Sequence, residues 1–552
     1  MDAHTDLSEV WSSSFSLGDR GMTVALRHAK PYRHQGGPAL LIVEEGALIM
    51  TQAERSLPAE GGQLALLDGS GPVTLTGQES ARVRLFSFGA KKPIHMVGGT
   101  SVCNLAVMAK SARLLGEPVE IASFGGYSIG VCAEGMEAGP TWSVLQMLRE
   151  PIGMDGKASC NVQILYRSEA PLAPNSASEV ADLAIIGAGP AGLSLAAHAL
   201  HHGLTVAVFG EPMSFWKRSI MPLTLRSLAA TTNIDTPVPG FSYQEFARAK
   251  GLPDSSQIPF HAFLAYAQHF IQGHALEINR ARVTGLSRVG HAWLLATPGG
   301  NRCARNVVVA VGLKGMERVP NAIRSSGIRY ALASEIQSFR AYSGTRVAIL
   351  GGAQSAAEIA LTAASEGGEE VHLLVRSPRI KYRSLHAPGN PLFKLLFKRA
   401  DRFFHRLPLP VQDRMLRFLL KGTVEPELRQ QLDASDINIH TNVELGTLSE
   451  LLGDGVRIEL GGERLLAADH LIVATGYQYD VRRIPFLGEQ TAKGALRHIN
   501  GLPELNWYGE SSLPGVFFAG MSALRMLGPQ CQFVFGTRKV TPRIIERVLE
   551  RQ

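Results

Sequence analysis

The sequence predicts an α/β fold with two Rossmann-like dinucleotide-binding domains, preceded by an all-β domain. Two stretches carry the first prediction: "LAIIGAGPAG" (183–192) and "RVAILGGAQSAAE" (346–358) each read as a buried strand, a tight glycine turn and the start of a helix. From about residue 181 onward strands alternate with helices, which is typical of parallel sheets. Before residue 170, short β-type runs are separated by turn residues instead. At 552 residues the chain is also too long for one core.

Residues 1–170 are expected to form a β-rich domain. Runs such as "ALLIVEEGALIM" and "ARVRLFSFG" alternate with Gly, Pro, Asp and Ser turns, which favours a sandwich or a small barrel. This strand–turn–strand layout resembles cupin barrels, whose metal sites usually need a close histidine pair, a glutamate and a later histidine. Here His28, His34, Glu44 and His95 are scattered and no HxH occurs, so surface histidines are favoured over a metal site.

Composition narrows the classes of partner. The net charge of +7 and the pI near 9.1 permit nucleic acid, but a site for phosphate-bearing cofactors explains them as well. No zinc spacing or recognition-helix signature occurs, so nucleic acid is not expected. The five cysteines form no CxxC pair, which predicts reduced thiols. No signal pattern and no apolar run of bilayer length occurs, so we expect a cytoplasmic protein without membrane contact and leave a homodimer open.

Two segments break the regular pattern. Residues 171–180 lie in a stretch rich in Pro, Ala and Ser and read as a linker. Residues 377–431 interrupt the alternation of strands and helices with "NPLFKLLFKRADRFFHRLPLPVQDRMLRFLLKG", which is helical, apolar and basic together. Three interpretations stay open for this segment: a packed helical insertion, a lid over a pocket, or a membrane-surface element.

The glycines of the first motif have separate expected roles. Gly187 allows the strand-to-helix turn, Gly189 lets backbone amides approach a pyrophosphate, and Gly192 lets helix and strand pack closely. With Pro190 and Ala191 the motif opens an Ala- and Leu-rich helix, whose N-terminal N–H groups favour a diphosphate. An apolar strand precedes it and a second strand, "LTVAVFG", follows, and this context predicts dinucleotide binding.

The second motif reads Gly351-Gly352-Ala353-Gln354-Ser355, so alanine replaces the middle glycine. A methyl group there crowds a pyrophosphate. Gln354 and Ser355 could hydrogen-bond phosphate or ribose at the helix start. The motif is therefore either a functional NADPH site or a degenerate half that is purely structural.

The residues that end the second strand of each unit are expected to contact the adenosine ribose. In the first unit the aligned position is Gly210, and Glu211 follows as the candidate carboxylate. In the second unit the strand ends at Arg376, with Arg379 and Lys381 close behind. A basic residue there suits the 2′-phosphate of NADPH, whereas an acid would favour NADH.

Further motifs extend the pattern over residues 181–552. Trp216, Arg226 and Ser227 match a recurrent Trp…Leu-Arg-Ser stretch, and Ala310-Val311-Gly312 stands where Ala-Thr-Gly is usual. Later come Asp469 with Ala474-Thr475-Gly476-Tyr477, and then Gly520 after a buried strand and Gly528-Pro529 before a helix. Together these motifs resemble the flavin-containing (class B-like) FAD/NADPH monooxygenases.

The resemblance implies a discontinuous FAD domain, residues 181–343 and 465–552, with an NADPH domain, residues 344–464, inserted into it. It implies FAD and NADPH as cofactors and a small-molecule substrate with O₂. One oxygen atom would pass from a C4a-(hydro)peroxyflavin to this substrate, by Baeyer–Villiger oxidation or N-hydroxylation, in specialised metabolism. A charge could steady a peroxide anion, and Arg226 is the candidate catalytic residue.

Motifs and resemblance together assign a set of residues to cofactor binding. The set is Gly187, Gly189, Pro190, Ala191, Gly192, Glu211, Trp216, Arg226, Ser227, Gly312, Gly351, Gly352, Gln354, Ser355, Arg376, Arg379, Thr475, Gly476, Gly520 and Gly528. The sequence departs from this group in one further respect. The fingerprint histidine expected shortly before the second motif is absent, and the nearest aligned residue is Leu332.

Two other classes of function stay open. A flavin reductase or NADPH oxidase would pass electrons without inserting oxygen, although a disulfide reductase would need a redox cysteine pair that the sequence lacks. A redox-sensing binding protein would use the β-rich domain to recognise a ligand. Formation of hydrogen peroxide in the same amount as the NADPH consumed would indicate the reductase or oxidase. Binding of a partner that depends on a ligand would indicate the redox-sensing protein.

Overall fold

The computed structural model describes residues 180–552 except 219–223, 226–230, 253–257, 337–338, 383–398, 420–421, 451–454 and 461–464. Before residue 180 it describes the strands given below and residues 111–112, 114–115, 118 and 136. No helix in these described ranges is long and apolar enough to cross a membrane.

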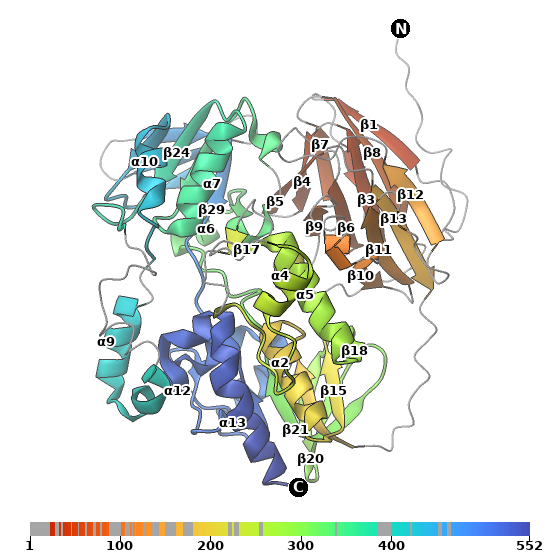
Figure 1. Ribbon diagram of the computed structural model, residues 1–552. Coiled ribbons are helices and arrows are strands. Elements are labelled where there is room, and N and C mark those ends of the chain that lie inside the picture. Colours follow the sequence, from red (N-terminus) through yellow and green to blue (C-terminus); the bar gives the residue numbers. More distant parts are fainter. Residues whose placement is uncertain are drawn as a thin grey trace.

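The N-terminal part consists of three antiparallel sheets, which lie beside the two α/β domains in Figure 1. The first has the order β1 (Met22–Arg27), β8 (Ser80–Ser87), β3 (Gly37–Glu45), β6 (Gln63–Gly69) and β9 (Ser101–Asn104). The second has the order β2 (Tyr32–His34), β7 (Val73–Gly77), β4 (Ala47–Gln52) and β5 (Arg55–Glu60). The third has the order β10 (Val119–Phe124), β11 (Tyr127–Ala133), β13 (Val162–Ser168) and β12 (Ser143–Leu148).

The expected strands before residue 170 are therefore present, while the cupin likeness stays a prediction. His28 and His95 lie outside the described residues, and nothing is described of the side chains of His34 and Glu44. Among the described contacts with the rest of the molecule is one made by Ser111, which is fully buried and whose Oγ donates a hydrogen bond to the carbonyl of His261 at 2.9 Å.

The first α/β domain is built on a sheet that joins distant parts of the chain. Its order is β18 (Ile278–Asn279), β15 (Val206–Phe209), β14 (Ala181–Ile186), β21 (Arg302–Val309), β20 (Ala292–Ala296) and β19 (Gly285–Val289). The second half of β21 pairs in parallel with β32 (Val516–Phe518). β14, β15, β18, β21 and β32 are parallel, as the alternating pattern predicts.

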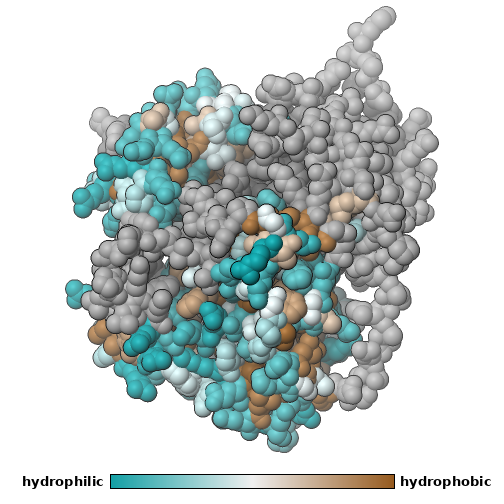
Figure 2. Space-filling model, in the orientation of Figure 1, coloured by the Kyte–Doolittle hydropathy of each residue, from teal (hydrophilic) through white to brown (hydrophobic). Residues whose placement is uncertain are grey.

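Helices cover this sheet and bury its apolar side chains. α2 (Pro190–His201) packs on α13 (Thr537–Leu549), and Ser194 Oγ lies 3.0 Å from Thr541 Oγ1 between them. α4 (Tyr243–Ala249) and α5 (Phe260–Gly273) lie toward the N-terminal sheets (Figure 1). On the face seen in Figure 2, the described residues are mainly hydrophilic, with small apolar patches around α4 and α2.

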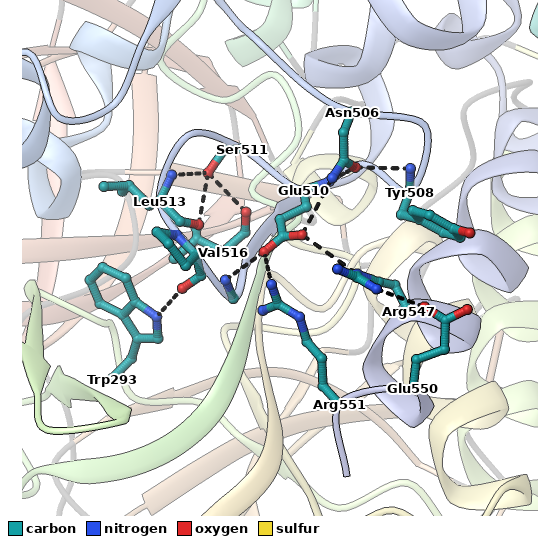
Figure 3. A network of polar contacts seen from close by, with 12 residues as sticks. Trp293, Asn506, Tyr508, Glu510, Ser511, Leu513, Val516, Arg547, Glu550 and Arg551 are labelled. Atoms are coloured by element: carbon teal, nitrogen blue, oxygen red, sulfur yellow. Dashed lines mark hydrogen bonds and ion pairs between the residues drawn. The ribbon is translucent and has the colours of Figure 1, made fainter.

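A buried carboxylate fixes the last strand to the C-terminal helix (Figure 3). Glu510 is 6% exposed and accepts hydrogen bonds from the Gly515 backbone N–H at 2.9 Å and from the Asn506 amide at 3.3 Å. The guanidinium groups of Arg547 and Arg551 balance its charge. Because a buried charge is costly without partners, these contacts hold α13 against the sheet.

The second α/β domain has a smaller parallel sheet. Its order is β22 (Ala331–Leu332), β29 (His470–Val473), β23 (Arg346–Leu350), β24 (Glu370–Leu374) and β25 (Ile437–His440). α7 (Gln354–Ser365) and α10 (Glu427–Asp433) pack together beside it, and a meander follows: β26 (Leu448–Glu450), β27 (Val456–Glu459) and β28 (Leu465–Ala468). β22 and β29 of this sheet thus lie outside the range 344–464, one on each side of it.

The segment between β24 and α10 joins the two domains, and several of its described residues pack against the first domain, whereas Leu409, Val411 and Phe418 are exposed. Phe404 is fully buried in the core of the first domain. Asp401 Oδ2 lies 2.8 Å from Arg543 on α13, and Asp413 on α9 (Leu409–Leu419) lies 2.6 Å from Arg525. These contacts favour the interpretation of residues 377–431 as a packed insertion.

Trp507 lies at the border between this insertion and the first domain. The Arg543 guanidinium lies 3.5 Å from the centroid of the Trp507 ring, and the ring centroid of His405 lies 4.8 Å away. The side chain is 37% exposed. It therefore contacts α13 and the insertion at once.

Candidate functional site

Two glycines of the first motif allow very close backbone approach. Gly187 follows β14 with φ +120°, a conformation that side chains disfavour, and a Cβ there would overlap the carbonyl of Ala310 at the end of β21. A Cβ at Gly192 would overlap the carbonyl of Gly187. The expected roles of both residues in the turn and in helix packing agree with this geometry.

Gly189 differs because its missing side chain leaves a space. It is the N-cap of α2, no described side chain caps it, and a Cβ there would meet no described atom within 4 Å. Pro190 begins the helix, and the next two N–H groups, those of Ala191 and Gly192, have no partner inside the helix, whereas the Leu193 N–H donates to the Gly189 carbonyl. This open end of α2 fits a diphosphate group.

Glu211 directly follows β15 and is held by two cations. Its carboxylate is 8% exposed and lies 2.9 Å from Lys217 Nζ and 3.1 Å from Arg280 NH1. These contacts hold the Glu211 carboxylate close to the end of β15. No pattern in the sequence indicated Lys217 and Arg280 as its partners.

Trp216 lies on α3 (Ser214–Arg218) within an aromatic cluster. Its ring centroid is 5.0 Å from that of Phe263 and 5.8 Å from that of Phe215. Phe215 in turn lies 6.0 Å from Tyr477, and burial raises the pKa of the Tyr477 hydroxyl. The cluster thus extends from α3 in the first domain to Tyr477, in the segment after β29 where the chain returns from the second domain to the first. Arg226 and Ser227 lie outside the described residues, so their roles stay predictions.

Three glycines that each follow a parallel strand leave space where a side chain would otherwise lie. Gly312 follows β21, Gly476 follows β29 and Gly520 follows β32, with φ between +71° and +79°. A Cβ at any of them would meet no atom of the described chain within 4 Å. Gly528, with φ +76°, is different, because a Cβ there would lie 3.2 Å from Ala400 and 3.3 Å from Phe404 in the insertion.

The chain passes between the two domains twice, near residues 316–318 and again near residues 475–478, and these two crossing segments are hydrogen-bonded to each other. The Arg318 N–H donates to the carbonyl of Gly476 at 2.8 Å, and the Gln478 N–H donates to that of Met316 at 2.8 Å. The Thr475 hydroxyl donates to the Arg318 carbonyl, so Thr475 stabilises the crossing. A cleft of about 360 Å³ lies beside it. The lining residues are Glu317, Arg318, Val319, Pro320, Asn321, Arg324, Gln478, Asp480 and Arg483.

The second motif repeats the close packing of the first. A Cβ at Gly351 would lie 2.5 Å from the carbonyl oxygen of Ala474, and a Cβ at Gly352 would lie 2.7 Å from Val375 Cγ1. Ala353 is the N-cap of α7, with φ −119°. The strand, the turn and the helix start are therefore formed as the sequence predicts.

The start of α7 is covered by residues 422–425, which we call the strap. The Gln354 N–H donates to the Thr423 carbonyl at 3.1 Å, and the Gln354 side-chain oxygen accepts from the Glu425 N–H at 2.8 Å. A Cβ at Gly422 would overlap the Ala353 methyl group. The strap therefore covers the helix start of α7 at the place where α2 leaves an open space.

Comparisons with known proteins agree with this architecture. Residues 184–388 match the family described as pyridine nucleotide-disulphide oxidoreductase. The FAD-dependent urate hydroxylase of Xanthomonas campestris pv. campestris is 27% identical in an alignment over 339 residues that covers 56% of this chain and 68% of that protein. The ornithine N-hydroxylase of Kutzneria sp. 744 is 20% identical with a TM-score of 0.58, over 68% of this chain and all of that one.

The reduced ornithine hydroxylase of Pseudomonas aeruginosa is similar too, with 17% identity and a TM-score of 0.55, over 67% of this chain and 99% of that one. The α/β part of the chain has the fold of these two hydroxylases, so the fold expected from the sequence is confirmed for this part. The share of the chain that these structures match is about the share that residues 181–552 make up.

In this fold, Arg376 and Arg379 lie just beyond the carboxyl end of β24 and are exposed. Ser355, in the first turn of α7, is exposed as well. Leu332, at the place of the fingerprint histidine, is 6% exposed in an apolar cluster with Ala348. The arginines are thus accessible, whereas Leu332 serves the core.

Proposed function

We propose that the protein is an FAD-dependent monooxygenase that consumes NADPH and transfers one oxygen atom of O₂ to a small organic substrate. The relationship to flavin-dependent monooxygenases supports this class of enzyme and its cofactors. The observation that carries the proposal is the open N-terminus of α2, where Gly187 and Gly192 pack without space and Gly189 leaves room for a diphosphate.

The residues of this chain would hold FAD at three places. The N–H groups of Ala191 and Gly192 would donate to its diphosphate, and Glu211 would accept from its ribose. Gly312 and Gly520 would let the backbone approach its ring without a side chain in between. When bound, FAD supplies the redox chemistry with O₂, and the protein orients it and limits access of water.

On the nicotinamide side, Arg376 and Arg379 would bind the 2′-phosphate of NADPH. Both are exposed at the carboxyl end of a parallel strand, where nucleotides bind in sheets of this kind. Guanidinium groups match the geometry of phosphate oxygens. Ser355 would contact the cofactor from the first turn of α7.

The substrate reaction is proposed as N-hydroxylation or Baeyer–Villiger oxidation. The relatives named above act on different molecules by their names, ornithine and urate, so they select no substrate for this chain. Arg226 stays the candidate for steadying a developing negative charge.

The test begins with colour and ends with product mass. Purified protein should show flavin absorbance, which NADPH should bleach in the absence of O₂. A screen of amines and ketones should then yield a product heavier by one oxygen, with less hydrogen peroxide when substrate is present. A colourless protein that stays colourless with added flavin would refute the proposal. NADPH consumption fully matched by peroxide with every substrate would indicate an oxidase instead.

A further inference from the structure

The alanine of the second motif has a structural counterpart. Ala353 replaces the middle glycine, and the residue that meets its methyl group is itself a glycine, Gly422. A Cβ on Gly422 would overlap this methyl group, so only one of the two positions can carry a side chain in this arrangement. Gly422 is not in the left-handed region, so its backbone does not require glycine. Close contact with Ala353 is therefore the reason that a side chain is excluded at Gly422.

The strap is fixed on the side away from α7 as well. Val424 is fully buried in the core of the second domain, and its N–H donates to the Lys381 carbonyl at 2.9 Å. Val424 also forms a parallel bridge with Tyr382. The strap thus lies beside Lys381 and Tyr382, which follow Arg379 in the chain, and α10 begins right after it.

The strap also presents acceptor groups where a phosphate would present its oxygens. The Thr423 carbonyl accepts the Gln354 N–H at the first residue of α7. The corresponding residue of α2 is Pro190, which has no N–H. At α2 the space above Gly189 is open, whereas at α7 the strap backbone contacts Ala353. The two helix starts therefore differ in what lies over them.

From these contacts we infer that the Ala353–Gly422 contact controls access of the NADPH diphosphate to α7, because the strap must leave the helix start before the diphosphate can approach it. This inference rests on the proposed use of NADPH. The apparent affinity for the dinucleotide is then its affinity for the strap-open form multiplied by the fraction of molecules in that form. Ala353 and Gly422 set that fraction.

The variant Gly422→Ala tests the inference, since its methyl group cannot lie against Ala353. It should open the strap and tighten NADP⁺ binding by about tenfold, measured by titration calorimetry of the FAD-loaded protein. In the double variant A353G/G422A the methyl group moves from one side of the contact to the other, so affinity should return toward that of the wild type. Thr423→Ser is the matched control, because Thr423 bonds α7 through its backbone carbonyl only.

A second measurement needs no variant. Amide hydrogen exchange at Gln354 and Glu425, whose N–H groups form the strap bonds, should rise in the wild type when NADP⁺ is saturating. Gly422→Ala should raise it without any nucleotide. Equal NADP⁺ affinity of wild type and Gly422→Ala, or unchanged exchange on binding, would overturn the inference.

Both readouts are made without turnover, so they separate the inference from the proposed function. If Gly422→Ala binds NADP⁺ more tightly but neither protein oxidises NADPH, the role of the strap stands and the proposed function fails. If NADPH reduces the flavin with the same affinity in both proteins, the proposed function stands and the role of the strap fails.

Discussion

The two glycine motifs form the same strand, turn and helix but differ in what covers the helix start. In both, the first glycine packs against the end of a neighbouring strand, at Ala310 in one domain and at Ala474 in the other. Over α2 the middle position is open, while over α7 it is filled by a methyl group and the strap. A motif of this kind therefore defines a local fold, and its surroundings decide whether a dinucleotide can reach it.

The largest effect is expected from a methyl group where the first motif has no space. Gly192→Ala would overlap the Gly187 carbonyl, so the strand and helix must move apart. We expect a loss of about 3 kcal/mol in the free energy of unfolding, measured by denaturant titration of the flavin-free protein. Wild-type stability in this variant would contradict the packing role of Gly192.

Gly189→Ala sharpens the comparison, because its methyl group enters the open space. The flavin-free protein should keep wild-type stability, since no described atom lies within 4 Å of the new Cβ. FAD affinity should fall by about a hundredfold, which corresponds to about 2.7 kcal/mol, as measured by flavin fluorescence. Ala353→Gly, the converse change at α7, should leave FAD affinity unchanged. Equal FAD affinity of Gly189→Ala and wild type would contradict the proposal that the FAD diphosphate binds at the start of α2.

The strand ends offer a third contrast, between Glu211 in the first domain and Arg376 in the second. Arg376→Ala should lower the preference for NADPH over NADH by about tenfold, because it removes a cation from the 2′-phosphate. The measurement is flavin reduction by each nucleotide in stopped flow. Arg457→Ala, at an exposed arginine on β27, is the control. An unchanged ratio would place the 2′-phosphate elsewhere.

The smallest effect concerns acid stability of the second sheet. The hydrogen bond from the Arg346 side chain, at 2.7 Å, lowers the pKa of Asp469. A lowered folded-state pKa means that the stabilisation is complete above about pH 4, the ordinary value, and is lost as pH falls through the lowered pKa. The pair is half exposed, so Asp469→Asn should cost less than about 1 kcal/mol at pH 7. The cost should vanish at the lowest pH, and a pH-independent cost would contradict this origin.

Local signals were enough to predict the parts of the fold that depend on neighbouring residues. Glycines such as Gly187 and Gly351 indicated the strand–turn–helix units because a tight turn needs them at fixed spacing. Contacts between distant residues left no such signal. The binding of Glu211 by Arg280, the packing of Gly528 on the insertion and the strap over Gln354 all join segments far apart in the chain.

The alanine at position 353 shows the limit most clearly. In the sequence it was a departure from the usual glycine motif, compatible either with a functional NADPH site or with a degenerate half that is purely structural. In the fold it is one half of a contact whose other half, Gly422, carries no recognisable motif. Its meaning depends on a residue that only the folded chain brings near.

Trp507 gives the molecule an optical readout of its own. Its ring lies between Arg543 of the first domain and His405 of the insertion, and the same insertion leads into the strap and α10. A shift of the insertion would change the polarity around the indole and hence the wavelength of its emission. The difference in emission between the wild type and a Trp507→Phe variant would report, in real time and without a label, a movement of the insertion against the first domain.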